Sequence, residues 1–408
     1  MKRVLTFKRA RVYALVFIGL YVVAWGYELN LATPPVYGDG VPIGGDYIAF
    51  HAAGRLLLQG RGSELYDRSA VVAVQDGFLD GRAPGFYDAF RNPAFAALPF
   101  VLLALVDLIP GYLAWSVVSL GALGLAIWLL LQQLPELRPR WRGLLVLVFA
   151  FAPVFFGLID GQNATVSLLL YVLIYRALVR NQDERAAFWA GLGLFKPQLF
   201  LVFPLVLLAR RSWTALGVYA LTAVGLGAAS VALVGPDGVA AWLRIVTEPE
   251  SGQVLVNSWR MVSLQSLFHT LLRNQPTLAL GLYVAASAAL LGVLVRVWAD
   301  RRTPPNLSWI FTSLVAVLVD PHLVDYDLTV LIPAGVLAVR DVPAVRWWLV
   351  ALYVLVVFRA ELPITDESAI QLSALVLCVC AGIVWNQLRP RLSVEALGTP
   401  KLHGASSA

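Results

Sequence analysis

The chain is dominated by apolar stretches of about twenty residues, the length that an α-helix needs to cross the hydrocarbon core of a bilayer. Hydrophobic residues make up 59% of the 408 residues and charged residues only 14%, with a mean hydropathy of +0.74. Soluble proteins carry about 25% charged residues. The sequence therefore predicts an all-α polytopic membrane protein and excludes a soluble globular or disordered one.

The apolar stretches predict twelve membrane spans, of which two are short helices within residues 186–209, broken at Lys196-Pro197. The other ten are residues 12–31, 111–131, 143–159, 164–180, 213–234, 277–298, 307–319, 322–339, 344–360 and 369–386. We expect residues 93–109 to lie half-inserted in the outer leaflet, because a full span there would invert every later basic loop. About two thirds of the Lys and Arg residues then share the side of the N-terminus, which is cytoplasmic by the positive-inside rule.

We expect one polytopic domain over residues 1–391, with both termini cytoplasmic and a short disordered tail at 392–408. Two long segments face outward: residues 32–110, with juxtamembrane helices, and residues 235–275. The acidic residues collect on this outer side, which places the chemistry there. The net charge of +6 is explained by topology, so no nucleic-acid partner is expected. Two cysteines, Cys378 and Cys380, cannot form a disulfide framework or a four-ligand zinc site.

Residues 44–60, GGDYIAFHAAGRLLLQG, predict an amphipathic helix that begins after Asp46 and lies at the membrane surface. Tyr47, His51, Arg55 and Gln59 recur every four residues and form its polar stripe. Asp46 has two interpretations. It can be the N-cap of this helix, or a general base at the water–lipid boundary that accepts a proton from an attacking hydroxyl.

Lys196 is one of four lysines, and the other three lie near the termini. An ammonium group in an apolar segment is costly and marks a candidate functional site. Pro197 breaks the helix there and indicates a pocket in the outer leaflet. The lysine either contacts a phosphate, for which a point charge is suited, or snorkels to the membrane surface.

Two further polar groups interrupt apolar runs. The sequence Asp160-Gly-Gln-Asn163 suits a tight turn, and it places a carboxylate and an amide on the outer side. Residues 320–327, DPHLVDYD, bring several carboxylates and an imidazole to the outer end of a span. The spacing of His322 and Asp325 places them on one helix face. Metal binding by His322, Asp325 and Asp327 has only weak support from this spacing, and no metal or other cofactor is expected.

Six segments together resemble glycosyltransferase family 87, a GT-C family. This family includes the polyprenyl-phosphate-mannose-dependent mannosyltransferases that act on phosphatidylinositol mannosides. The segments stand in the order that the family shows. They are GGDYIAFHAAGRLLLQG with Leu65-Tyr66, FRNPAFAALPF at 90–100, DGQNATVSLLL at 160–170, AGLGLFKPQLFLVFPLVLLARRSW at 190–213, NSWRMVSLQSLF at 257–268 and DPHLVDYDL at 320–328.

The resemblance implies a GT-C fold in the plasma membrane and inverting, metal-independent transfer of a sugar, most simply mannose, on the extracytoplasmic face. The donor would be a polyprenyl-phosphate sugar, the acceptor a hydroxyl of a lipid-linked or cell-envelope glycan, and Asp46 the general base. For the donor phosphate we expect Lys196, His322, Arg91 and Arg260. For other substrate contacts we expect His51, Tyr66, Asp160, Gln162, Asn257, Gln265 and Asp325.

A secondary transporter or lipid flippase of cell-envelope precursors is the alternative, and a non-catalytic scaffold a further one. Transporters commonly show internal repeats and polar groups near the bilayer midplane. The sequence has no detectable repeat, and its polar groups collect at the outer ends of the spans. These features favour the enzyme.

Overall fold

The computed structural model describes residues 6–247, 260–358, 361–365 and 368–393. Within them the chain is helical apart from one antiparallel hairpin, β1 (Glu361–Thr365) with β2 (Ser368–Gln371). The prediction of a helical membrane protein is confirmed, since several helices have the length and composition of membrane spans.

Five helices are long and apolar enough to cross a bilayer: α1 (Phe7–Leu31), α5 (Leu108–Gln133), α12 (Trp213–Thr247), α15 (Pro276–Ala299) and α19 (Leu372–Ser393). The number rises to seven if each of two bent pairs of helices counts as one span. In the first, Pro135–Phe149 and Ala152–Ile159 meet at 63°; in the second, Asp325–Asp341 and Pro343–Val357 meet at 115°. Within the described part of the chain, the expected twelve spans are therefore not confirmed.

The difference arises because several predicted spans are short or broken helices. α8 (Ala164–Val179) and α16 (Pro305–Val319) fall below the length of a typical span. The predicted break at Lys196-Pro197 is present: α9 (Asp183–Leu192) and a 3₁₀ turn, η4 (Gly193–Phe195), precede it, and α10 (Pro197–Phe200) and α11 (Phe203–Ala209) follow it. Proline in the first turn of α10 and α11 starts a new helix, since its missing N–H is not needed there.

The segment between α1 and α5 folds into short helices: α2 (Tyr47–Leu58), η1 (Gly62–Glu64), α3 (Arg68–Leu79), η2 (Ala94–Ala97) and α4 (Leu98–Leu103). The predicted helix after Asp46 is therefore present. Its expected polar stripe is wrong, because Tyr47 and His51 are fully buried. Residues 94–103 form a helix too short to cross a bilayer, as expected of a segment that does not span.

These short helices have their own aromatic core, which packs against α5 and the end of α12. Phe50 stacks on Phe100 with ring centroids 4.8 Å apart. Gly54 makes this approach possible, because a Cβ there would lie 2.3 Å from the Phe100 carbonyl oxygen. The helical periodicity indicated an apolar face on α2, but α3, α4 and α5 cover its polar face as well, which explains the buried Tyr47 and His51.

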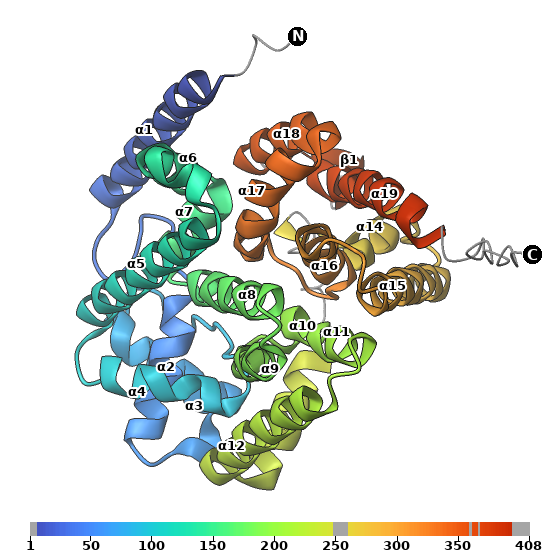
Figure 1. Ribbon diagram of the computed structural model, residues 1–408. Helices are drawn as coiled ribbons and strands as arrows, with labels where there is room; N and C mark the ends of the chain where they lie inside the picture. Colours follow the sequence, from blue (N-terminus) through green and yellow to red (C-terminus); the bar gives the residue numbers. More distant parts are fainter. Residues whose placement is uncertain (1–5, 248–259, 359–360, 366–367, 394–408) are drawn as a thin grey trace, which may run out of the picture.

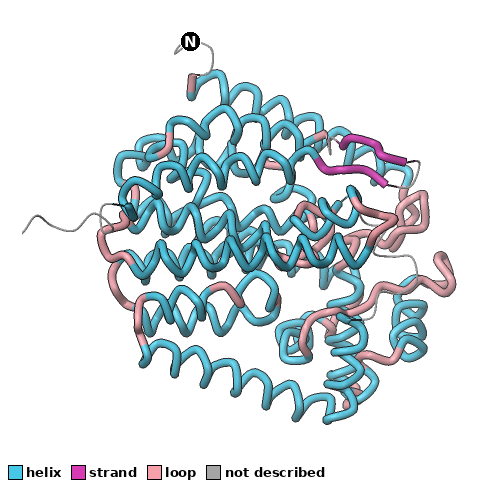
Figure 2. The backbone as a smooth tube through the Cα atoms, turned by 90° about the vertical axis from the view of Figure 1, so that its right-hand side faces the viewer, coloured by secondary structure: helices cyan, strands magenta, loops and turns pink. Residues whose placement is uncertain are grey.

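Figure 1 shows α8 between α5 on one side and the C-terminal helices on the other. α8 packs on α5 and on η6 (Asp325–Leu331), the 3₁₀ segment that continues into α17 (Ile332–Asp341). Most helices run side by side, and the hairpin and several long loops gather at one end (Figure 2). The remaining elements are η3 (Pro135–Arg140), α6 (Trp141–Phe149), α7 (Ala152–Ile159), α14 (Leu264–Leu271), η7 (Pro343–Val345) and α18 (Arg346–Val357).

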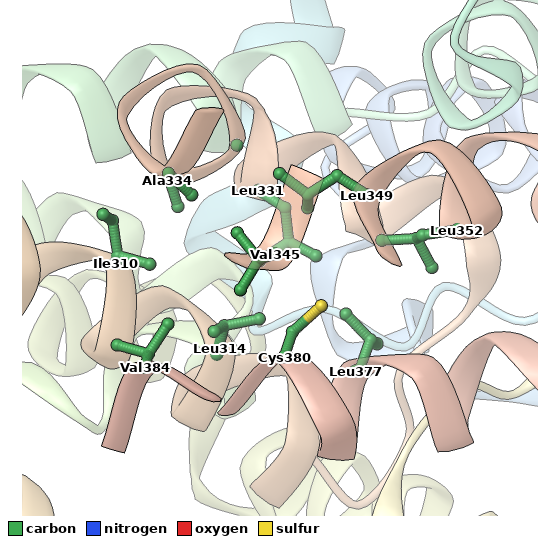
Figure 3. A pocket seen from close by; sticks show the side chains of 12 residues that line it. Ile310, Leu314, Leu331, Ala334, Val345, Leu349, Leu352, Leu377, Cys380 and Val384 are labelled. Carbon is green, nitrogen blue, oxygen red and sulfur yellow. The ribbon is translucent and has the colours of Figure 1, made fainter. Parts of the chain in front are cut away.

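A cavity of about 30 Å³ lies between α16, α17, α18 and α19. Figure 3 shows aliphatic side chains such as Leu331 and Leu352, together with Cys380, around it. It has room for little more than one water molecule, which would need polar partners that this lining does not supply. The cavity is lined by none of the polar residues described below.

Cysteine labelling tests the expected orientation. Ser63 is exposed in η1, and Glu184 is exposed in the first turn of α9, directly after the loop at 180–182. Each can be changed to Cys after Cys378 and Cys380 are replaced by Ala. A membrane-impermeant maleimide should label Ser63→Cys in intact cells. It should reach Glu184→Cys only after permeabilisation, because the positive-inside rule places that loop in the cytoplasm. The reverse pattern would contradict the orientation.

Candidate active site

Asp46 precedes α2 but does not cap it with its side chain. Its backbone has φ −65° and ψ −9°, and no cap hydrogen bond forms. Instead, Gln162 Nε2 donates a hydrogen bond of 2.5 Å to Asp46 Oδ2. The N-cap interpretation is therefore wrong, and the half-buried carboxylate belongs to a polar cluster.

The partner of Asp46 comes from the turn between α7 and α8. This turn packs directly on the start of α2: Gly161 has φ +60°, and a Cβ there would lie 2.5 Å from Tyr47 Cβ. Trp115 Nε1 donates to the Gly161 carbonyl at 2.8 Å. The residues DGQN thus form the predicted turn, and the turn also brings Asp160 and Gln162 to Asp46.

Arg260 joins this turn to the start of η6. Its Nη2 lies 2.9 Å from Asp160 Oδ2 and 3.2 Å from Asp325 Oδ1. The backbone supports the arrangement, since Met261 forms an isolated bridge with Val324. Burial and the neighbouring charge of Asp46 raise the pKa of Asp160 to about 6, although Arg260 acts in the opposite direction.

Lys196 lies at the other side of the same cluster. Its Nζ is 2.6 Å from Asp327 Oδ1, and both side chains are buried, so the snorkelling interpretation is wrong. Lys196 Nζ lies 4.9 Å from the centre of the Tyr326 ring, and the Arg260 guanidinium lies 5.3 Å from it. Tyr326 was not among the predicted site residues. The alternation in Asp325-Tyr326-Asp327 could have indicated it, since two carboxylates there flank a ring.

His322 does not share a helix face with Asp325, because η6 begins only at Asp325. A turn precedes it, in which the His322 N–H donates to Asp320 Oδ1 at 2.7 Å. Solvent reaches the His322 side chain, but the surrounding protein desolvates it in part. This desolvation, together with the charge of Arg91, lowers the pKa of the imidazole, which is therefore neutral at pH 7.

The other predicted residues lie elsewhere or contribute differently. His51 contacts Tyr47 and Phe78 in the core of the first loop, and Tyr66 donates to the Asn92 carbonyl. Gln265 is half-buried on α14, and Asn257 lies outside the described residues. Arg91 is half-buried, and its carbonyl accepts a hydrogen bond from Trp242. Across the described residues, no three His, Cys, Asp or Glu side chains are grouped as metal ligands.

The Lys196–Asp327 pair gives a test of stability. Lys196→Met should leave a buried carboxylate without its cation, at a cost of about 3–5 kcal/mol. The melting temperature of the detergent-solubilised protein should therefore fall. The double variant Lys196→Met/Asp327→Leu should recover most of it, and Lys8→Met, at an exposed lysine, should change nothing. An unchanged melting temperature in the single variant would contradict the buried ion pair.

Comparison with protein families places these residues in a known group. The model of glycosyltransferase family 87 matches residues 90–324, more than half of the 408-residue chain. The matched region includes Arg91, Asp160, Gln162, Lys196, Arg260 and His322. Neither the curated proteins nor the solved structures gave a match. The chain belongs to glycosyltransferase family 87, and it is a glycosyltransferase rather than a transporter or a scaffold.

Proposed function

We propose that the protein transfers a sugar, most simply mannose, from a polyprenyl-phosphate donor to a hydroxyl of a lipid-linked or cell-envelope glycan, with inversion at the anomeric carbon. One observation carries the proposal. Asp46 precedes the region that the family model matches. It lies in one cluster with Lys196 and Arg260, which are inside that region, and with their carboxylate partners, which are inside it or just beyond its end.

Asp46 is the proposed general base. The attacking hydroxyl must lose a proton, and a half-buried carboxylate held by one hydrogen bond at Oδ2 has a second oxygen with which to accept it. The candidate spans and the apolar surface of α1 and α12 suit a lipid-anchored donor. With the expected orientation, the reaction takes place on the extracytoplasmic face of the plasma membrane, and the acceptor is part of the cell envelope.

The donor phosphate is proposed to lie beside Lys196 and His322, with Arg91 and Arg260 near it. An ammonium group has three N–H donors, and Asp327 accepts one of them. The leaving polyprenyl phosphate gains negative charge as the glycosidic bond breaks, so fixed cations stabilise the transition state. The neutral imidazole of His322 can add an N–H donor.

The contacts fit an inverting displacement. Gln162 contacts Asp46, and Arg260 contacts Asp160 and Asp325. The centre of the Tyr326 ring lies 4.9 Å from Lys196 Nζ and 5.3 Å from the Arg260 guanidinium. The proposal places the base and the phosphate-binding cation on opposite sides of the sugar. Inversion requires this separation, since the hydroxyl attacks the face opposite to the phosphate.

Asp46→Asn tests the base. Membranes containing the protein are supplied with polyprenyl-phosphate mannose labelled in the sugar, and label in lipids and glycans is measured. The variant should lose about a hundredfold or more of the activity, the scale of a general base, with an unchanged melting temperature because Asn keeps the size of the side chain. Asp67→Asn is the matched control: Asp67 caps α3 in the same loop, and this variant should transfer normally.

The outcomes separate the parts of the proposal. Wild-type rates in Asp46→Asn would reject the assigned base. If wild-type protein transfers glucose or arabinose from the same lipid phosphate but not mannose, the sugar is wrong and the base can still be tested with the accepted donor.

A further inference from the structure

The carboxylate of Asp46 is oriented from a distant part of the chain. With no cap interaction to hold it, its rotamer is set by the hydrogen bond from Gln162 Nε2, 116 residues away along the chain. A carboxylate accepts hydrogen bonds and cannot donate them, so the NH₂ end of the amide must face it. The bond occupies Oδ2 and directs it toward the α7–α8 turn.

Gln162 is itself rigidly placed. It is buried, with 6% of its surface exposed, and its backbone N–H donates to the Gly157 carbonyl at 2.8 Å. The turn is fixed to α5 by Trp115 through the Gly161 carbonyl and by Tyr112, whose hydroxyl lies 3.1 Å from the Ile159 carbonyl oxygen. A buried amide on a turn held in this way has little freedom to move, so the position of its N–H groups is well defined.

We propose that Gln162 is a positioning residue, which holds Oδ2 of Asp46 so that Oδ1 faces the acceptor hydroxyl. The inference rests on the proposed role of Asp46 as base, and it replaces the expectation that Gln162 contacts the substrate. A neutral donor is suited to this position, because it stabilises the carboxylate and does not itself change protonation state with pH.

The charges around Asp46 explain why the amide matters. Asp160 belongs to the same turn as Gln162, and Arg260, Asp325 and Tyr326 reach the cluster from the segment after residue 259 and from η6. Arg260 already serves two carboxylates. A further carboxylate at position 162 would therefore add uncompensated negative charge directly against the base.

Gln162→Glu is the sharpest test, because it keeps the shape of the side chain and replaces the amide by a carboxyl. Two adjacent carboxylates disfavour ionisation of both. The acidic limb of the pH profile for mannose transfer from polyprenyl-phosphate mannose should therefore move up by about one pH unit or more. On the acidic limb itself, the rate at a given pH should therefore fall about tenfold for a shift of one unit, and it should recover at alkaline pH. Gln59→Glu, the same change at an exposed residue after α2, should leave the profile unchanged.

Gln162→Ala is the second variant. It should lower kcat about tenfold or more, the scale of one lost hydrogen bond to a charged group, with little change in the KM for the donor. The acidic limb should move up by less than in Gln162→Glu, because the carboxylate loses a donor but gains no neighbouring charge. Melting temperatures of all variants are measured alongside, and if Gln162→Glu does not fold, Gln162→Ala decides.

Two results would overturn the inference: a wild-type pH profile in folded Gln162→Glu, or an effect confined to KM, which would mark Gln162 as a substrate contact. Asp46→Asn, measured in parallel, distinguishes the two levels. If Asp46→Asn is inactive and Gln162→Glu is normal, only the positioning role fails. If Asp46→Asn is active, both the proposed base and the positioning role of Gln162 are rejected.

Discussion

The site depends on one guanidinium group. Arg260 binds Asp160 on the α7–α8 turn and Asp325 at the start of η6, and without it two partly buried carboxylates would face each other near Asp46. Bidentate and shared contacts of this kind suit arginine, whose planar fork presents several N–H donors at once. By joining segments that lie 65 and 100 residues away from it along the chain, Arg260 assembles a cluster that no single helix could provide.

The cluster carries more carboxylates than cations, which constrains how it can bind an anionic donor. Asp46, Asp160, Asp325 and Asp327 face Lys196 and Arg260, and the fully buried Asp320 lies beside them. Burial raises the pKa of Asp160 and of Asp320, so burial disfavours the ionised form of both carboxyl groups. This lessens the repulsion of a phosphate at its proposed position beside Lys196 and His322.

Local sequence patterns predicted the features that depend on residues close together in the chain. Periodicity identified the helix after Asp46, proline identified the break at Lys196, and polar residues identified the turn at 160–163. The burial of His51 and the partner of Asp46 were not predictable in this way, because both depend on which distant segment covers a helix face. The expected number of spans is not confirmed, for a related reason. Apolar composition identifies buried or lipid-facing segments, but helix length and bends such as those of 63° and 115° decide how many of them can cross a bilayer.

The family match begins at residue 90, so it contains the proposed phosphate-binding residues and omits Asp46. Asp46, the proposed base, joins them only if the segment between α1 and α5 packs on the other helices. That packing relies on Gly161, because a side chain there would collide with Tyr47 at the start of α2, and on Trp115, which holds the Gly161 carbonyl. The proposed role of Asp46 therefore depends on the packing of α2 against the α7–α8 turn. A change at Gly161 would act on Asp46 without touching it, by displacing the amide of Gln162 from the carboxylate.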